Sequence, residues 1–284
     1  MRRSARLYGI AILVLLVLVF VIGIIVLRED RRGSLTVSFL DVGQGDAIFI
    51  DAPSGRQVLI DGGKGSTVLR QLSGVLPFYD RSIDMVAPTH PDADHIGGLL
   101  DVLKRYEIGT IIESGVQGDS SIFAAFEKAA QEEGSERLVA KRGDVFDLGG
   151  GAQLEILFPD RAVPGVETNT GSLVARLTYG ATSFLLPGDA PQNIEEYLAR
   201  LDGKNLKSNV LKAGHHGSRT SSAALFVGYA SPEYAIFSRG CENTYGHPHQ
   251  EVVDLLARFE IPTLDTCEEG TITFVSDGKT VRRK

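Results

Sequence analysis

The sequence predicts a layered α/β domain that follows one apolar N-terminal segment. Short runs rich in Val, Ile, Leu and Phe, bounded by Gly- and Pro-bearing turns, alternate with longer segments that have helical spacing. No repeat, low-complexity run or second domain boundary interrupts this alternation, and the 43% hydrophobic share is ordinary for a globular protein. We therefore expect one α/β domain over residues 33–284.

The N-terminal segment has the length of a membrane-spanning helix. Residues 7–27 carry no charge and number 21, against the roughly 20 that a span needs. A cleaved signal peptide is the alternative, but its apolar region would be ~7–15 residues long and followed by small residues. Here the run ends in charged residues, so we expect an uncleaved membrane anchor and linker over residues 1–32.

The first half of the domain alternates strands and helices. Apolar runs between Gly and Pro turns predict strands at 35–40, 47–50, 57–60 and 109–112. The run at 83–88 is expected to be a buried strand, because Pro88 and Pro91 exclude a helix there. Helical spacing of apolar residues predicts helices at 67–76, 99–106 and 121–133. Ser120 or Ser121 is expected to cap the last of these.

The second half continues the same pattern. Apolar runs predict strands at 153–158, 173–178, 183–186, 209–211, 234–237, 262–266 and 271–274. Helical spacing predicts helices at 192–201, 222–229 and 250–259.

All six histidines lie in three short motifs, at 89–98, 212–218 and 243–249. The first motif reads H-x-D-x-D-H and contains His90, Asp92, Asp94 and His95 on an expected strand-to-helix turn. Histidine and carboxylate at this density indicate a metal site. His90 and Asp92 would bind one metal, and Asp94 and His95 a second. A charged loop with one aspartate capping the helix is the alternative, but it explains only that aspartate.

The first motif resembles the H-x-H-x-D-H signature of the metallo-β-lactamase superfamily, with Asp92 in place of the second histidine. This replacement resembles the C-terminal hydrolase domain of ComEC-type DNA-uptake proteins. Supporting segments follow in the family's order, at 39–47, 59–63, 169–174, 185–189, 212–218 and 245–248. The resemblance implies a four-layer αββα sandwich with the ligands on loops at one edge.

The resemblance also assigns roles to the remaining site residues. Asp189 would bridge both metals, and His247 would complete the second site. His215 would protonate the leaving oxygen or bind the phosphate, and Lys212 would neutralise phosphate charge. Three further residues are expected to contact the substrate: His216, Ser218 and Asn243. For His216, a packing role is the alternative. Many family members have a metal-binding histidine upstream of the aspartate that corresponds to Asp189. The matching segment of this chain has Asn169 and Ser172 and no histidine. The expected metal ligands are therefore His90, Asp92, Asp94, His95, Asp189 and His247.

An oxygen-rich ligand set favours manganese over zinc, although zinc is possible. The expected function is that of a membrane-anchored two-metal hydrolase, acting on DNA as a nuclease or phosphodiesterase. Alternatives are a hydrolase of another ester, such as a lactone, thioester or small phosphodiester, and a non-catalytic metal-stabilised binding module. Without residues 1–32 the chain has 23 basic and 34 acidic residues, a formal charge near −11. This charge excludes a generally basic nucleic-acid module.

Topology and partners complete the expectations. One span cannot form the ComEC channel, so a separate DNA-uptake channel is a possible partner, and the oligomeric state is open. Three arginines precede the span and three follow it, so charge does not orient it. The resemblance places the hydrolase domain outside the cytoplasm. The expected strands at 234–237 and 262–266 are joined by the expected helix at 250–259, and such a unit would bring Cys241 and Cys267 to the same end of neighbouring strands. An oxidising compartment would allow a disulfide there, and two unrelated thiols are the alternative.

Overall fold

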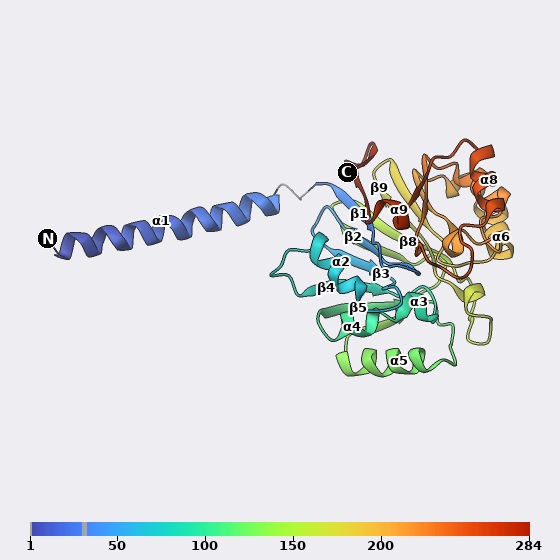
Figure 1. Cartoon of the computed structure of the whole chain (residues 1–284), viewed down its shortest axis with the longest axis horizontal. Coiled ribbons are helices and arrows are strands. Elements are labelled where there is room, and N and C mark those ends of the chain that lie inside the picture. The colour runs from blue at the N-terminus through green and yellow to red at the C-terminus, as the bar shows by residue number, and fades with distance from the viewer. Residues whose placement is uncertain (1, 30–32) are drawn as a thin grey trace.

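The computed structural model describes the backbone of residues 2–29 and 33–284, and the side chains of residues 8–23 and 33–284. Helix α1 (Arg2–Glu29) projects from the remainder of the chain (Figure 1). Its large apolar side chains between Tyr8 and Ile22 are exposed. Within the described residues, no helix combines the length and apolarity needed to cross a membrane. Part of the expected anchor (7 and 24–27) and of the linker (31–32) lies outside the described side chains, and the anchor stays a prediction.

The described part of the domain contains two β-sheets. The first has eight strands in the order β15-β14-β1-β2-β3-β4-β5-β6. Its strands are β1 (Leu35–Phe39), β2 (Ile48–Asp51), β3 (Gln57–Ile60), β4 (Ser82–Ala87), β5 (Glu107–Glu113), β6 (Glu136–Val139), β14 (Ile272–Ser276) and β15 (Val281–Arg283). Pairing is antiparallel from β15 to β3 and parallel from β3 to β6.

The second sheet has seven strands in the order β13-β12-β11-β10-β9-β8-β7. Its strands are β7 (Val145–Gly149), β8 (Ala152–Phe158), β9 (Val174–Tyr179), β10 (Thr182–Leu186), β11 (Val210–Lys212), β12 (Tyr234–Phe237) and β13 (Thr263–Asp265). Strands β10 to β13 are parallel, which suits a segment whose connections are helices.

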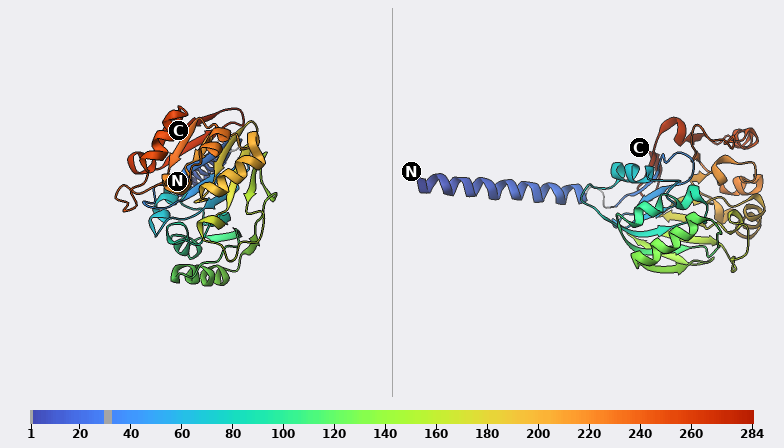
Figure 2. Two further views of the ribbon diagram at one scale, coloured as in Figure 1. Left: turned by 90° about the vertical axis from the view of Figure 1, so that its right-hand side faces the viewer. Right: turned by 60° about the horizontal axis from the view of Figure 1, so that its bottom comes forward.

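Helices cover the outer faces of both sheets. The first sheet carries α2 (Thr67–Val75), α3 (Ala93–Ile96), α4 (Leu99–Leu103) and α5 (Ser121–Glu133). The second carries α6 (Gln192–Asp202), α7 (Ala224–Ala230) and α8 (Gln250–Arg258). A third apolar core, with Phe39, Phe184 and Phe274 among its members, lies between the sheets. The predicted αββα arrangement is therefore confirmed, and Figure 2 shows the layers from two further directions.

Local chemistry explains the best-defined helix boundaries. The side chain of Ser120 accepts a hydrogen bond from the Phe123 backbone N–H, so Ser120 is the N-cap of α5. Gly134 ends the same helix in the left-handed conformation that glycine adopts without steric cost. The predicted helix at 99–106 is shorter, since α4 ends at Leu103.

The strand–helix–strand unit near the C-terminus forms as predicted. Strands β12 and β13 are parallel neighbours, and α8 lies between them in the chain. Cys241 and Cys267 form a disulfide, with their Cα atoms 5.0 Å apart. The predicted pairing is confirmed, and the bond joins the loop that contains His247 to the short helix α9 (Thr266–Glu269).

Candidate metal centre

Four loops bring the centre together at one edge of the two sheets. They connect β1 to β2, β4 to α3, β10 to α6, and β11 to α7, the last through a short 3-10 turn, η3 (Gly214–Gly217). Each loop follows or precedes a buried strand, so the sandwich fixes its ends. Side chains that are far apart in the sequence can therefore meet in a fixed geometry.

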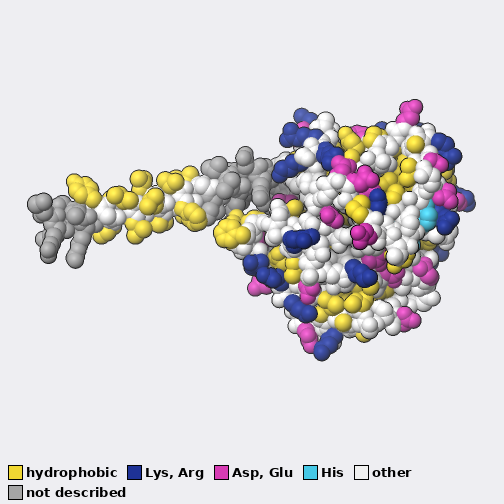
Figure 3. All heavy atoms as spheres, in the orientation of Figure 1, with side chains coloured by type: hydrophobic (Ala, Val, Ile, Leu, Met, Phe, Trp, Pro, Cys, Tyr) yellow, Lys and Arg dark blue, Asp and Glu magenta, His cyan; other side chains and the backbone are white. Residues whose placement is uncertain are grey.

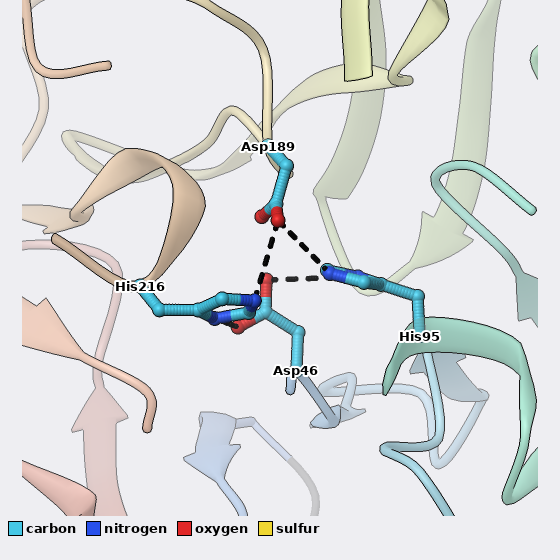
Figure 4. A group of neighbouring side chains, drawn as sticks. All are labelled: Asp46, His95, Asp189 and His216. Atoms are coloured by element: carbon cyan, nitrogen blue, oxygen red, sulfur yellow. Dashed lines mark hydrogen bonds and ion pairs between the residues drawn. The ribbon is translucent and has the colours of Figure 1, made fainter. Parts of the chain in front are cut away.

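The innermost group consists of Asp46, His95, Asp189 and His216, and we call it the buried cluster (Figure 4). One ligand atom from each residue lies within 4.8 Å of the others, and all four residues are buried. Asp189 Oδ2 is 3.2 Å from His95 Nε2 and 3.2 Å from His216 Nε2. Two imidazole nitrogens and a carboxylate oxygen thus point at one position, which is the geometry of a metal-ligand set.

Hydrogen bonds orient both histidines of the cluster. His95 Nδ1 lies 2.8 Å from Asp61 Oδ2, and Asp61 also accepts hydrogen bonds from the backbone N–H and hydroxyl of Thr89. His216 Nδ1 donates to the Ser238 carbonyl at 2.8 Å. In each case the outer nitrogen is held by the protein and Nε2 faces the centre, as is usual for metal-binding histidines.

Electrostatics in the absence of a cation follow from this packing. Burial alone would lower the pKa of His95 and His216, but the carboxylates around them raise it well above its usual range. Burial alone would raise the pKa of Asp46, but Lys212 and His216 lower it to about 2. Protons on the two imidazoles therefore occupy the positions at which a cation would bind.

Lys212 is buried behind the cluster rather than exposed at its mouth. Its Nζ contacts Asp46 Oδ2 at 2.5 Å, the Gly188 carbonyl at 2.8 Å and Asp189 Oδ1 at 3.0 Å. The ammonium group neutralises carboxylate charge inside the protein. The structure places none of its surface where a substrate phosphate could reach it.

The first motif supplies ligands on two sides of the cluster. Asp94 Oδ2 lies 3.4 Å from His216 Nε2, so Asp94 adjoins the cluster as predicted. His90 Nε2 lies 3.7 Å from Asp92 Oδ2, and the His90 ring packs 4.1 Å from the His95 ring. His90 and Asp92 therefore form a separate pair beside the cluster, which is the arrangement expected for a second ion.

His215 and His247 line the outer side of the site. The His215 side chain is 26% exposed, and its Nε2 lies 3.6 Å from Asp189 Oδ2. The His247 ring is 5.5 Å from that of His215. Burial and the neighbouring histidines lower the pKa of His247 to about 4, and burial lowers the pKa of His215. Both imidazoles are therefore neutral near pH 7.

The predicted substrate-side residues are engaged in loop structure. Ser218 is buried, and its hydroxyl lies 3.0 Å from the Thr220 hydroxyl. Asn243 donates to the carbonyls of Gly240 and His247 and accepts from the His247 backbone N–H. These contacts position His247, so the structure gives Asn243 a role in shaping the loop.

Buried nitrogen atoms without a hydrogen-bond partner show that the site has ligand atoms to offer a cation. Among the described residues, His90 Nε2, His216 Nε2 and His247 Nδ1 are buried without a hydrogen-bond partner. A buried polar atom without a partner is costly, and binding a cation would satisfy it. The carboxylate-rich surroundings fit divalent cations in charge and in ligand type.

Sequence reasoning missed Asp46 and Asp61 as site residues and placed His216 on the substrate side. Asp46 follows Gly45, where an added Cβ would lie 1.9 Å from the Asp94 carbonyl. Only glycine permits this close approach of the β1–β2 loop to the first motif. The Gly-Asp and Asp-Gly-Gly segments around Asp46 and Asp61 were the available signal, but each is common in ordinary turns.

Comparison with known proteins agrees with the geometry. The family described as "Metallo-beta-lactamase superfamily" matches residues 40–240. ComE operon protein 3 of Bacillus subtilis is 34% identical over 256 residues, which cover 84% of this chain and 32% of that protein. Competence protein ComA of Neisseria gonorrhoeae is 31% identical, with the same coverages. The chain thus spans about a third of the length of these relatives. A CmlA β-hydroxylase mutant shares the fold, with a TM-score of 0.54 at 14% identity, over 84% of this chain and 53% of that one.

Proposed function

Because the chain belongs to the metallo-β-lactamase superfamily, which comprises metal-dependent hydrolases, we propose that it is a two-metal phosphodiesterase that cleaves DNA. The observation that carries the proposal is the position of Asp189, whose carboxylate meets both His95 and His216 inside the buried cluster. The similarity to ComE operon protein 3 and to a competence protein supports DNA as the substrate.

The candidate ligands fall into two groups, and we propose that Asp189 serves both. The inner ion would be held by the buried cluster together with Asp94, and the outer ion by His90 and Asp92. Bound divalent cations would activate a water and stabilise the charge on the attacked phosphodiester. With Asp46 included, the set contains four carboxylates, which favours manganese over zinc.

The chain's own residues prepare the site for this chemistry. Lys212 offsets the mutual repulsion of Asp46 and Asp189 and keeps both carboxylates ionised. His215 is the partly exposed imidazole beside Asp189, and its Nδ1 is held 3.1 Å from the Thr220 hydroxyl. In its neutral form His215 can hydrogen-bond the phosphate, and the fraction that is protonated can donate a proton to the leaving oxygen and become neutral.

Metal analysis and parallel activity assays test the proposal. The full chain in detergent is loaded with manganese or zinc and assayed on DNA, RNA, a lactone and a thioester. Two ions per chain and manganese-dependent DNA cleavage are expected. His215→Ala should keep both ions and lose roughly 10²–10⁴ in turnover, whereas Asp189→Ala should lose metal as well.

Other outcomes of the same assays would redirect the assignment. If the protein hydrolysed only the lactone or the thioester, the proposed nuclease activity would be replaced by hydrolysis of that ester. Binding of metal without turnover of any substrate would indicate a binding module. A single tightly bound zinc with full activity would overturn the two-manganese centre.

We also propose that residues 7–27 anchor the protein in a membrane, with the hydrolase domain outside the cytoplasm. The absence of charge over 21 residues supports the anchor. The disulfide between Cys241 and Cys267 supports an oxidising compartment. Free thiols in protein taken from its native membrane, labelled under denaturing and non-reducing conditions, would contradict this placement.

A further inference from the structure

The loop between α2 and β4 presents two aromatic side chains to solvent. Phe78 is 85% exposed and Tyr79 is 48% exposed. Phe78 has the largest exposed fraction among the large hydrophobic residues of the described domain. Their rings form an edge-to-face pair with centroids 5.4 Å apart. Most of the Phe78 side chain and about half of the Tyr79 side chain are therefore open to solvent at one loop tip.

Internal bonds hold this loop in place. The Asp80 backbone N–H donates to the Pro77 carbonyl at 2.9 Å, which closes a turn around the two aromatic residues. The Asp80 carboxylate accepts hydrogen bonds from the Ser82 backbone N–H and hydroxyl and from the Gln57 side chain. The turn is fixed to the neighbouring strands, so the exposure of Phe78 and Tyr79 is built into the fold.

Unpaired positive charge surrounds the aromatic pair. Arg70, Arg81 and Arg105 lie with Phe78 around a hollow of about 340 Å³. All three arginines are exposed, and none forms an ion pair with a residue that the structure describes. The three guanidinium groups therefore give this surface a local positive charge, although the domain as a whole has a formal charge near −11.

The surface lies at the end of the domain where α1 emerges. Figure 1 shows the loop between α2 and β4 extending toward the side of the domain that carries α1, and the second panel of Figure 2 agrees. In Figure 3, hydrophobic side chains gather at this end and Lys and Arg side chains lie close to them. Three independent features, namely exposed aromatics, unpaired arginines and proximity to α1, coincide on one face.

We propose that this surface, formed by Arg70, Phe78, Tyr79, Arg81 and Arg105, docks the domain on an anionic lipid bilayer; the proposal rests on the membrane anchor proposed above. Aromatic rings enter the bilayer interface, where one side is apolar and the other wet. Arginines beside them bind lipid phosphates. Docking would fix the orientation of the domain relative to the membrane.

A tryptophan reporter tests the proposal, since the chain contains no tryptophan of its own. The full chain with Phe78→Trp is reconstituted in vesicles of phosphatidylcholine with and without phosphatidylglycerol, and emission is quenched with brominated lipids. We expect a blue shift and strong quenching that increase with the anionic lipid. Phe259→Trp is the matched control, because Phe259 is also exposed, at 44%, but directly follows α8. Its emission should not respond.

Charge variants test the role of the arginines. Arg81→Gln and Arg105→Gln should each lower the ratio of docked to undocked domain about fivefold on anionic vesicles, because each basic group near such a surface contributes about 1 kcal/mol. Arg258→Gln, at the end of α8, should leave the ratio unchanged.

Flotation with the vesicles separates failure of the anchor from failure of the docking surface. Retained flotation without quenching of the Phe78→Trp variant would overturn docking and leave the anchor intact. Loss of flotation would overturn both. A lipid-free blue shift that increases with protein concentration would assign the surface to a second copy of the chain and overturn the lipid proposal.

Discussion

Glu195 in α6 is a buried carboxyl group beside the loop that carries His215 and His216. It is 1% exposed, and its Oε2 accepts a hydrogen bond from the Ala223 backbone N–H at 2.6 Å. Its Oε1 has no hydrogen-bond partner among the described residues and faces Gly214, where an added Cβ would lie 2.8 Å away. Burial raises the pKa of Glu195 from 4.5 to about 7. We predict that Glu195→Gln changes the pH dependence of stability.

The sign follows from proton linkage. Between pH 4.5 and 7 the unfolded state has released the Glu195 proton and the folded state has kept it, so the free energy of unfolding falls as pH rises. The loss of stability caused by Glu195 is nearly absent below the pKa that this group has in the unfolded state, and it is complete above the pKa that it has in the folded state. With about 1.36 kcal/mol per pKa unit, wild type should lose roughly 2–3 kcal/mol from this group between pH 5 and pH 8.

Glutamine removes this pH-dependent part because it does not ionise. Its oxygen can still accept the Ala223 hydrogen bond, whereas its amide nitrogen would take the unpartnered position. That unpaired donor costs about 1–3 kcal/mol at every pH. The informative quantity is therefore the slope of stability with pH, in which the constant cost cancels.

Urea denaturation of the chelated full chain in detergent, at pH values from 5 to 8, measures this slope. The stability of Glu195→Gln relative to wild type should rise by roughly 2–3 kcal/mol over this range. Glu196→Gln is the matched control, because the Glu196 side chain is 45% exposed and paired with Arg200. Parallel pH curves for Glu195→Gln and wild type would refute the reasoning.

Three further predictions concern the metal centre and the disulfide. Asp61→Asn should weaken manganese binding roughly 10–100-fold by calorimetry, since Asp61 orients a ligand of the buried cluster. Asp101→Asn is the control, because the Asp101 side chain in α4 is 37% exposed, and equal affinities for Asp61→Asn and wild type would remove the role of Asp61. Manganese binding at pH 7 should release protons, because the raised pKa values of His95 and His216 keep both imidazoles protonated in the metal-free protein. Calorimetry in buffers of different ionisation enthalpy measures this release, and a binding heat that is the same in all buffers would contradict it. Cys241→Ser with Cys267→Ser should lower the free energy of unfolding by about 2–4 kcal/mol, because the bond closes a 26-residue loop; unchanged urea midpoints under non-reducing conditions would contradict it.

The sequence by itself determined the strands that face the core and the order of the helices. Apolar runs such as those of β3 and β10 are buried on both faces, so local composition identifies them. The strands that sequence reasoning did not predict are β6, β7 and β15, and each is an edge strand. All four residues of β6 are exposed. An edge strand pairs with a neighbour on one side only, so burial constrains its sequence less than that of a central strand, and pairing with the neighbour defines it.

The sequence also identified the metal-binding motif and the pairing of Cys241 with Cys267. What the tertiary structure alone decided was which side chains share one centre. Asp46 enters the cluster because Gly45 lets its loop contact the first motif, and Lys212 is buried beneath two carboxylates rather than exposed to substrate. These contacts join residues that are distant in the sequence, such as Lys212 and Asp46, which lie 166 positions apart. Their physical cause is the packing of the two sheets against each other, which the local spacing of residues in the sequence does not reveal.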